Sequence, residues 1–179
     1  QYMAETFCQV VISSSLDNLG TPITPAAGAA EAADRFRAVI AAGTAAGGAE
    51  ATRLVNAANV GLARALLFTG DYAGAIAAAQ LVPASFVYMI PRVDDPSNRG
   101  SLGNTVFNYS RDRPSLVVPP YFRALNDPRV TSVLGGTGFP LKTQGNDLDF
   151  YRQQKYLDYG SDMRLASGLE ARYIIAEAQ

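Results

Sequence analysis

The sequence predicts a mainly α protein, in which helical hairpins of a repeat type are joined to a long irregular segment that contains short strands. Two observations support this fold class. Alanine-rich stretches with apolar residues at three- and four-residue spacing dominate residues 24–82 and return near the carboxyl end. Nearly all of the prolines and of the aromatic residues outside the expected helices fall between residues 83 and 162. The chain has 179 residues, 48% hydrophobic and 17% charged, so we expect one sizeable core.

Two helices are expected in the amino-terminal part of the chain, and a proline marks the start of the second. Residues 1–15 are interpreted as the end of a helix. Thr24 followed by Pro25 is a favourable start for the next one, because the hydroxyl can cap free amides and proline fits the first helical position. We expect the glycines between Gly43 and Gly48 to end that helix. Its apolar stripe is predicted to be Ala29, Ala32, Phe36, Val39 and Ile40.

A helical hairpin is predicted from about Glu50 to Val82. Its first helix is apolar on two sides, so it must pack on two sides. Gly70 stands where a left-handed carboxyl-terminal cap is expected, and Asp71 can cap the following helix. So short a turn requires the second helix, which ends before Pro83, to fold back antiparallel. The residues expected to be buried are Val55, Ala58, Val60, Leu62, Ala63, Ala65, Leu66 and Leu67 in the first helix, and Tyr72, Ala75, Ile76, Ala79 and Val82 in the second.

The irregular segment covers residues 83–162. Two short strands are expected in it, at Thr105–Tyr109 and at Ser115–Val118, and the run Gly135–Gly138 is expected to be a turn. A loop of this length is unusual inside a compact domain, and such segments are usually functional, so we expect ligand binding here. A last helix is predicted from about Leu165, with one apolar face made of Leu165, Leu169, Tyr173 and Ala176.

Residue counts exclude the common catalytic arrangements. The chain has no histidine and one cysteine, so a Ser-His-Asp triad, a Cys-His pair and a histidine-ligated zinc site cannot be built. A hydrolase with paired carboxylates needs a fixed pair in one cleft, and the sequence supplies none. We therefore expect no enzymatic activity, no cofactor and no metal. Cys8 is interpreted as a buried free thiol rather than a lipid-attachment site, because the preceding Glu5-Thr6-Phe7 lacks the small residues of a lipobox.

Net charge and hydropathy limit the classes of partner that the chain is expected to bind. The net charge is −1 and no basic face is clustered, so nucleic acid is not expected as a partner. No stretch approaches the roughly 20 apolar residues that a membrane helix needs. The pairs Asp94-Asp95 and Asp147/Asp149 could offer oxygens to calcium, but neither has a full ligand set in sequence, and a solvated turn is the preferred interpretation of both.

Four segments carry a resemblance to a known family. Val60–Ala75 resembles the tetratricopeptide-type hairpin of the SusD/RagB family of nutrient-binding outer-membrane lipoproteins. Asn126–Arg129 is similar to that family's recurring Asp-Pro-Arg element, and Gln154–Tyr156 to its Lys-Tyr element. Arg164–Ala178 resembles its late helix, which ends in Ala-Glu-Ala. The four segments occur in the family's order.

The resemblance implies a fold and a cellular location. It implies tetratricopeptide-like hairpins in a protein on the outer face of a Gram-negative outer membrane, lipid-anchored through a cysteine outside this chain. It also implies binding of a glycan or oligopeptide nutrient and its delivery to a TonB-dependent (SusC-like) transporter. Because family members are several hundred residues long, we expect this chain to be the middle of one. The expected division of this partial domain is a helical region over residues 1–82 with its repeat hairpin 50–82, a ligand-loop segment 83–162, and the start of a further repeat helix 163–179.

Candidate ligand-binding residues follow from chemistry. A sugar-binding surface needs flat aromatic rings for stacking and amide or carboxylate groups for hydroxyls. The residues that offer this mix in the irregular segment are Phe107, Asn108, Tyr109, Tyr121 and Phe122, with Asp147, Asp149 and Tyr151 as a further group. The alternative interpretation is that these rings anchor the long loop onto the helices. A second function class also stays open, a helical-repeat scaffold that binds a protein through a concave face.

Overall fold

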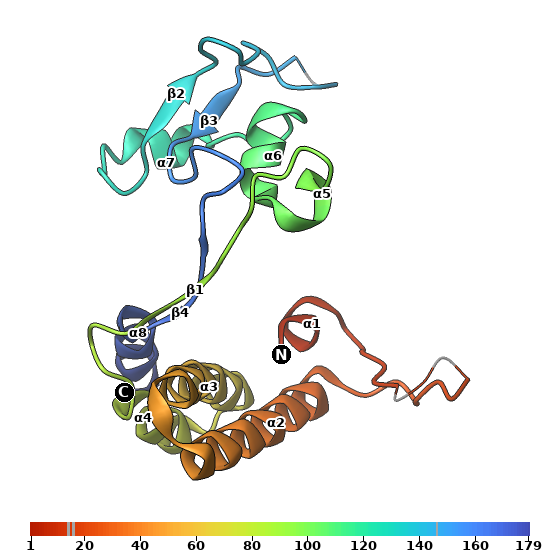
Figure 1. The fold of residues 1–179 in the computed structure, drawn as a ribbon, viewed down its shortest axis with the longest axis vertical. Coiled ribbons are helices and arrows are strands. Elements are labelled where there is room, and N and C mark those ends of the chain that lie inside the picture. Colours follow the sequence, from red (N-terminus) through yellow and green to blue (C-terminus); the bar gives the residue numbers. More distant parts are fainter. Residues whose placement is uncertain (14, 16, 146) are drawn as a thin grey trace. The chain divides into compact units, whose positions relative to one another are not determined.

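The computed structural model describes residues 1–13, 15, 17–145 and 147–179. The chain forms two compact units, Gln1–Tyr88 with Arg164–Gln179 and Met89–Met163, and each is described by itself. The described residues are mainly helical, with a few short strands (Figure 1). The prediction of a mainly α fold with some strands is therefore confirmed.

Helices make up most of the first unit. They are α1 (Tyr2–Thr6), α2 (Pro25–Ala46), α3 (Gly48–Thr69), α4 (Tyr72–Gln80) and α8 (Gly168–Ala178). Helix α2 has its predicted start, because the Thr24 hydroxyl accepts a hydrogen bond from the Ala27 amide at 3.2 Å, next to Pro25 in the first turn. It ends at Gly47, which has a φ of 67°.

The turn between α3 and α4 has both predicted caps. Gly70 has a φ of 81°, in the left-handed region that glycine adopts at little cost. The Asp71 amide donates to the Leu66 carbonyl at 2.9 Å, which satisfies one of the last acceptors of α3. The Asp71 carboxylate in turn accepts from the Gly74 amide at 2.9 Å and starts α4. The chain therefore leaves one helix and enters the next at Gly70 and Asp71.

Helix α3 is the centre of the core of this unit. It packs against α2, α4 and α8 (Figure 1). Both of its predicted stripes are buried or half-buried, and Val60 and Ala63 are fully buried. Gly61 permits close approach of α2, because a Cβ at this position would lie only 2.4 Å from the Phe36 ring. The buried residues of this core are Ala33, Val60, Leu62, Ala63, Ala65, Leu66, Ala75, Ala78, Ala79, Val82, Phe86, Ala166, Ala171 and Ile174.

Three side chains in the part of this unit from Gln1 to Tyr88 that were expected to be buried are exposed instead. Tyr72 is exposed because it is the first residue of α4, at the solvent-facing turn. Val39 is exposed on α2, whereas Phe36 and Ile40 pack against the core. Cys8 is also exposed, because the chain leaves α1 in an extended conformation at Phe7 and continues through exposed residues.

The last helix begins later than predicted. Leu165 belongs to strand β4 (Met163–Ser167), which pairs with β1 (Val87–Ile90) in a two-stranded sheet. Helix α8 starts after Ser167, whose hydroxyl accepts a hydrogen bond from the Glu170 amide at 3.3 Å. A strand with a cap at its end thus replaces the predicted first turn of helix.

The buried side of α8 also differs from the prediction. Ala171 and Ile174 join the core, while Leu169, Tyr173 and Ala176 are exposed. Residues three apart lie on the same side of a helix, so Ala171 and Ile174 define the side that packs against α3 and α4. The predicted apolar face lies on the solvent side of the described chain.

The second unit contains short helices and a small sheet. Its elements are α5 (Arg99–Leu102), α6 (Thr105–Arg111), α7 (Pro120–Ala124), β2 (Ser132–Leu134) and β3 (Tyr151–Gln153). Strands β2 and β3 pair antiparallel, with Ser132 opposite Gln153 and Leu134 opposite Tyr151 (Figure 1). The predicted glycine-rich turn is present, where Gly136 bridges to Phe139.

The two strands predicted from residue type are not strands. Thr105–Tyr109 lies in α6, because the Asn104 side chain accepts a hydrogen bond from the Phe107 amide at 3.0 Å and thereby caps a helix. Residues 115–118 belong to no strand, and the Val118 amide donates to the Tyr151 carbonyl at 2.8 Å. This hydrogen bond joins the approach to α7 to strand β3.

Aromatic rings and one asparagine form the interior of the second unit. The rings of Phe107 and Tyr159 meet edge-to-face with centroids 4.9 Å apart, and Phe150 is fully buried. The pKa of Tyr159 is raised to about 12. Burial of the side chain is the larger cause, and the hydrogen bond that its hydroxyl donates to Asp112 is the next. Asn104 is also buried, and its amide donates to the Ser161 carbonyl at 2.8 Å.

Candidate functional site

The structure divides the five predicted ligand-binding residues between two helices. Phe107, Asn108 and Tyr109 lie on α6, and only Tyr109 of these is exposed, at 37%. Phe107 is buried against Tyr159, so its prediction as a surface ring for stacking is wrong. It packs against Tyr159 and Phe139 inside the second unit, and not onto the helices of the first unit as the alternative interpretation expected.

Tyr121 and Phe122 form an exposed ring pair on α7. Their exposed fractions are 71% and 47%, and their ring centroids lie 5.4 Å apart at an interplanar angle of 74°. Pro120 in the first turn of α7 and the preceding Pro119 fix the backbone that carries the pair. An edge-to-face pair offers a ring face and a ring edge, and a ligand can stack on the exposed face.

A polar cavity follows α7 directly along the chain. This cavity is shallow and open to solvent. It has a volume of about 330 Å³ and is lined by Arg123, Asn126, Asp127, Pro128, Val130, Thr131 and Ser132. Asn126 has a φ of 50°, a left-handed conformation that asparagine tolerates better than most residues. This conformation turns the chain at the end of α7, after which it enters β2. The cavity contains two exposed or half-buried hydroxyls, an amide, a carboxylate and a guanidinium.

Asp127 and Arg129 form a local ion pair in the Asp-Pro-Arg element. The Asp127 carboxylate accepts hydrogen bonds from Arg129 through Nε at 2.9 Å, through a terminal nitrogen at 2.5 Å and through the backbone amide at 2.8 Å. These contacts lower the pKa of Asp127 from 3.8 to about 2, and the side-chain hydrogen bonds contribute more than the backbone one. The carboxylate in the cavity is therefore ionised and already paired.

Arg123 occupies a different position in the same cavity. Its guanidinium carbon lies 3.6 Å from the centroid of the Tyr151 ring, a close cation–π stack. Its Nε is buried and has no hydrogen-bond partner among the described residues. Tyr151 is on β3, so pairing of β2 with β3 and the stack on Arg123 fix α7 against the small sheet. Sequence reasoning missed this cavity.

Three of the carboxylates considered for calcium, those of Asp94, Asp95 and Asp149, are paired with cations or amides instead. Asp94 binds Arg99 at 2.6 Å, and Lys142 binds Asp149 at 3.0 Å, which raises the pKa of both cations. The Asn98 side chain and then the Ser97 amide lower the pKa of Asp95. Within the described ranges, no group of three or more histidine, cysteine, aspartate or glutamate residues is placed to hold a metal ion.

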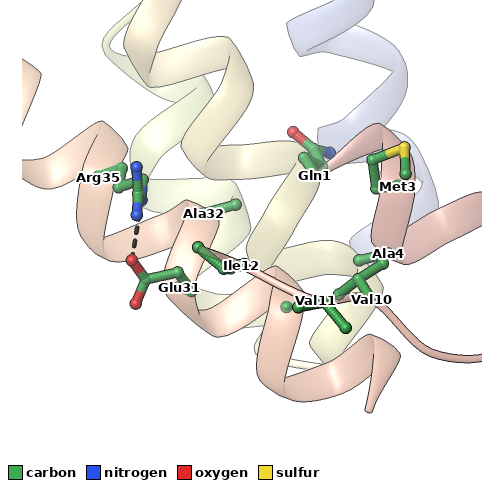
Figure 2. Close-up of a pocket in the computed structure, with 10 residues that line it drawn as sticks. Gln1, Met3, Ala4, Val10, Val11, Ile12, Glu31, Ala32 and Arg35 are labelled. Carbon is green, nitrogen blue, oxygen red and sulfur yellow. Dashed lines mark hydrogen bonds and ion pairs between the residues drawn. The ribbon is translucent and has the colours of Figure 1, made fainter. Parts of the chain in front are cut away.

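The first unit has a cavity of its own, shown in Figure 2. It has a volume of about 250 Å³ and lies where α1 and the segment Val10–Ile12 approach α2. Its lining is mostly aliphatic, and the ion pair between Glu31 and Arg35 of α2, at 2.8 Å, stands in it (Figure 2). Because few fixed polar groups converge here, this cavity is less suited than the Arg123 cavity to a ligand rich in hydroxyls or charge.

A shallow groove crosses α2, α3 and α4. It has a volume of about 380 Å³, and Ile40, Leu62 and Ala78 are among its mostly apolar lining residues. Asn59 also lines it, and its side-chain amide donates to the Val55 carbonyl of its own helix at 3.1 Å. The groove gives the helical unit an apolar surface of its own.

Comparisons with protein-family models, with curated proteins and with solved structures found no match. Of the helices in the stretches of chain that the structure describes, none is both long enough and apolar enough to cross a bilayer.

Proposed function

We propose that this protein binds a nutrient at the cell surface, a glycan or an oligopeptide, and delivers it to a TonB-dependent outer-membrane transporter. The observation that carries the proposal is the exposed pair Tyr121 and Phe122 on α7, the short helix whose Arg123 lines a polar cavity. Exposed ring faces provide stacking area, and fixed polar groups close to them in the chain provide orientation. This combination is what recognition of a hydroxylated or peptide ligand requires.

The sequence resemblance supports the same function. The Asp-Pro-Arg element of the SusD/RagB-like pattern is the segment that contains Asp127 and Arg129, next to α7. The hairpin with its turn at Gly70, which resembles the tetratricopeptide type, lies in the other unit. We propose on this basis that the helical unit serves as scaffold and that the second unit carries the ligand site.

Calorimetric titration of the chain against a panel of oligosaccharides and short peptides tests this proposal. Replacing Tyr121 and Phe122 together by alanine should weaken the best ligand by roughly 1–3 kcal/mol, by analogy with stacking losses for nucleic-acid bases. Tyr173→Ala is the control, because this tyrosine is similarly exposed but lies on α8. Equal affinity of the double variant and the parent chain would contradict a role for the ring pair.

The expected partner and location need a cellular experiment. We propose a lipid-anchored protein on the outer face of the outer membrane, in a complex with its transporter. Expression of the whole gene product in its host, followed by protease treatment of intact cells and by purification of the complex, tests both points. Recovery in the cytoplasm without a TonB-dependent transporter would refute them.

The groove across α2, α3 and α4 favours a second function, a scaffold that binds a protein segment. Its apolar lining around Ile40 and Leu62 fits an apolar helix or strand better than a sugar. Leu81→Asp, at an exposed position of the groove lining, should abolish such binding and leave nutrient affinity unchanged. Substitutions confined to one unit at a time therefore separate the two functions.

A further inference from the structure

Among the described residues, the guanidinium of Arg123 has an aromatic partner but no acidic one. It stacks on the Tyr151 ring at 3.6 Å. Within the same described ranges it has neither a carboxylate partner nor a hydrogen bond for its buried Nε. A buried donor without a partner costs free energy, so such a group in a folded protein calls for a physical explanation.

Stacking limits how a ligand can meet this group. One face of the guanidinium is covered by Tyr151 and its Nε is buried, so its two terminal nitrogens are left for recognition. A planar fork of N–H groups matches the two oxygens of a carboxylate, which it binds with two parallel hydrogen bonds. The stack also holds the fork in place, so less conformational entropy is lost when a ligand binds.

The rest of the cavity is compatible with an acidic ligand. Its one carboxylate among the described lining residues, Asp127, is paired with Arg129 through both side-chain and backbone contacts. Its negative charge is thus offset locally. Asn126, Thr131 and Ser132 add an amide and two hydroxyls to the lining. A volume of about 330 Å³ is at the small end for ligand cavities and suits one sugar ring or one amino-acid residue.

We propose that this cavity binds the carboxylate of an acidic ligand, with Arg123 as its anchor. The inference rests on the proposed nutrient-binding function and deepens it by naming the class of nutrient. Two sources of the carboxylate fit this chemistry, a uronic acid in a glycan and the free carboxyl end of a peptide. Asn126 and the hydroxyls of Thr131 and Ser132 then serve the neutral portion of the ligand.

Four probes separate these sources by calorimetric titration of the 179-residue chain. The glycan pair is trigalacturonic acid and its full methyl ester, and the peptide pair is trialanine and its carboxyl-terminal amide. In each pair only the charged carboxylate is removed. We expect at least one acid to bind about tenfold or more tightly than its neutral partner, and its affinity to fall as salt is added.

Substitutions assign the effect to one side chain. Arg123→Gln removes the charge and the fork, and should weaken the preferred acid by about tenfold or more. Arg123→Lys keeps the charge without the fork and should give an intermediate loss. Arg113→Gln makes the same charge change at an exposed position of the same unit and should change the affinity by less than about twofold. Circular dichroism and thermal unfolding check that each variant is folded.

A measurement on the unmodified chain covers the case in which Arg123→Gln fails to fold. The Nε–H signal of Arg123 in a ¹⁵N NMR spectrum should shift when the preferred acid is added and stay in place with its neutral partner. An acid that binds without moving this signal would overturn the inference. So would equal affinity for acids and neutral partners, binding of neither acid, or full affinity in a folded Arg123→Gln variant.

The outcomes also separate this inference from the function on which it rests. Binding of neutral oligosaccharides with no preference for acids overturns the carboxylate site and leaves nutrient binding in place. Acid binding that depends on Arg123 but not on Tyr121 and Phe122 supports the carboxylate site and contradicts the role of the ring pair.

Discussion

The carboxylate of Asp127 is held ionised by a residue only two positions away. Three nitrogens of Arg129 donate hydrogen bonds to it, and the Asp-Pro-Arg sequence places both ends of this contact in one turn. The contact requires no long-range folding, so a short sequence element is enough to encode it. It also leaves Arg123, among the described lining residues, as the cation of the cavity without an acidic partner.

The pKa of Asp127 predicts how stability changes in acid. The folded pKa of about 2 is lower than the usual 3.8, so the pair stabilises the folded chain fully above pH 3.8. This contribution is lost as the pH falls from 3.8 toward about 2. The stability difference between the parent chain and Asp127→Asn, from urea unfolding, should therefore shrink over that interval.

An NMR titration of the Asp127 carboxyl provides the control. Arg129→Gln should return the pKa of Asp127 toward 3.8, because Arg129 supplies the contacts that lower it. A stability difference between parent and Asp127→Asn that stays constant from about pH 5 to about 2 would contradict the assignment.

At the scale of the element, helices α2, α3 and α4 could be predicted well because their signals are local. The caps at Thr24, Gly70 and Asp71 act within a few residues, and all three are found where the sequence places them. The strand predicted at Thr105–Tyr109 failed for a related reason. Its β-branched and aromatic residues favour a strand, but the hydrogen bond of the Asn104 cap outweighs this preference and starts α6.

Gly70 is the element-scale test of the hairpin. Alanine in its left-handed conformation should destabilise the chain by about 1–2 kcal/mol in denaturant unfolding. Gly70→Asn should cost less, because asparagine visits this region more readily. Equal losses for both variants would mean that the φ of 81° is not what limits this position.

A pair of leucine truncations tests which helix faces are buried. Leu66→Ala removes a buried side chain of α3 and should cost roughly 2–5 kcal/mol. Leu169→Ala makes the same chemical change on the exposed side of α8 and should stay within about 0.5 kcal/mol of the parent. A large loss of stability in Leu169→Ala would show that the apolar face predicted from the sequence pattern is buried after all.

At the scale of the whole molecule, the contacts that define the candidate site are the ones sequence reasoning could not supply. The cavity forms where α7, the left-handed Asn126 and β2 meet, and β2 is fixed by pairing with β3 some twenty residues further along the chain. The stack of Arg123 on Tyr151 has no local signature either. Of the rings, Tyr121 and Phe122 could be anticipated from residue type, but the burial of Phe107 against Tyr159 could not.

Because the chain forms two compact units, we expect each unit to unfold as a separate cooperative region. Each has its own interior, built on aliphatic residues around Val60 in the first and on the buried rings of Phe107, Phe150 and Tyr159 in the second. Leu66→Ala should therefore speed hydrogen exchange of amides in the first unit much more than in the second. Phe150→Ala, at a cost of roughly 3–5 kcal/mol, should do the reverse. Native-state hydrogen exchange read by mass spectrometry assigns each peptide to a unit, and an equal loss of protection in both units for either variant would show that the chain unfolds as one.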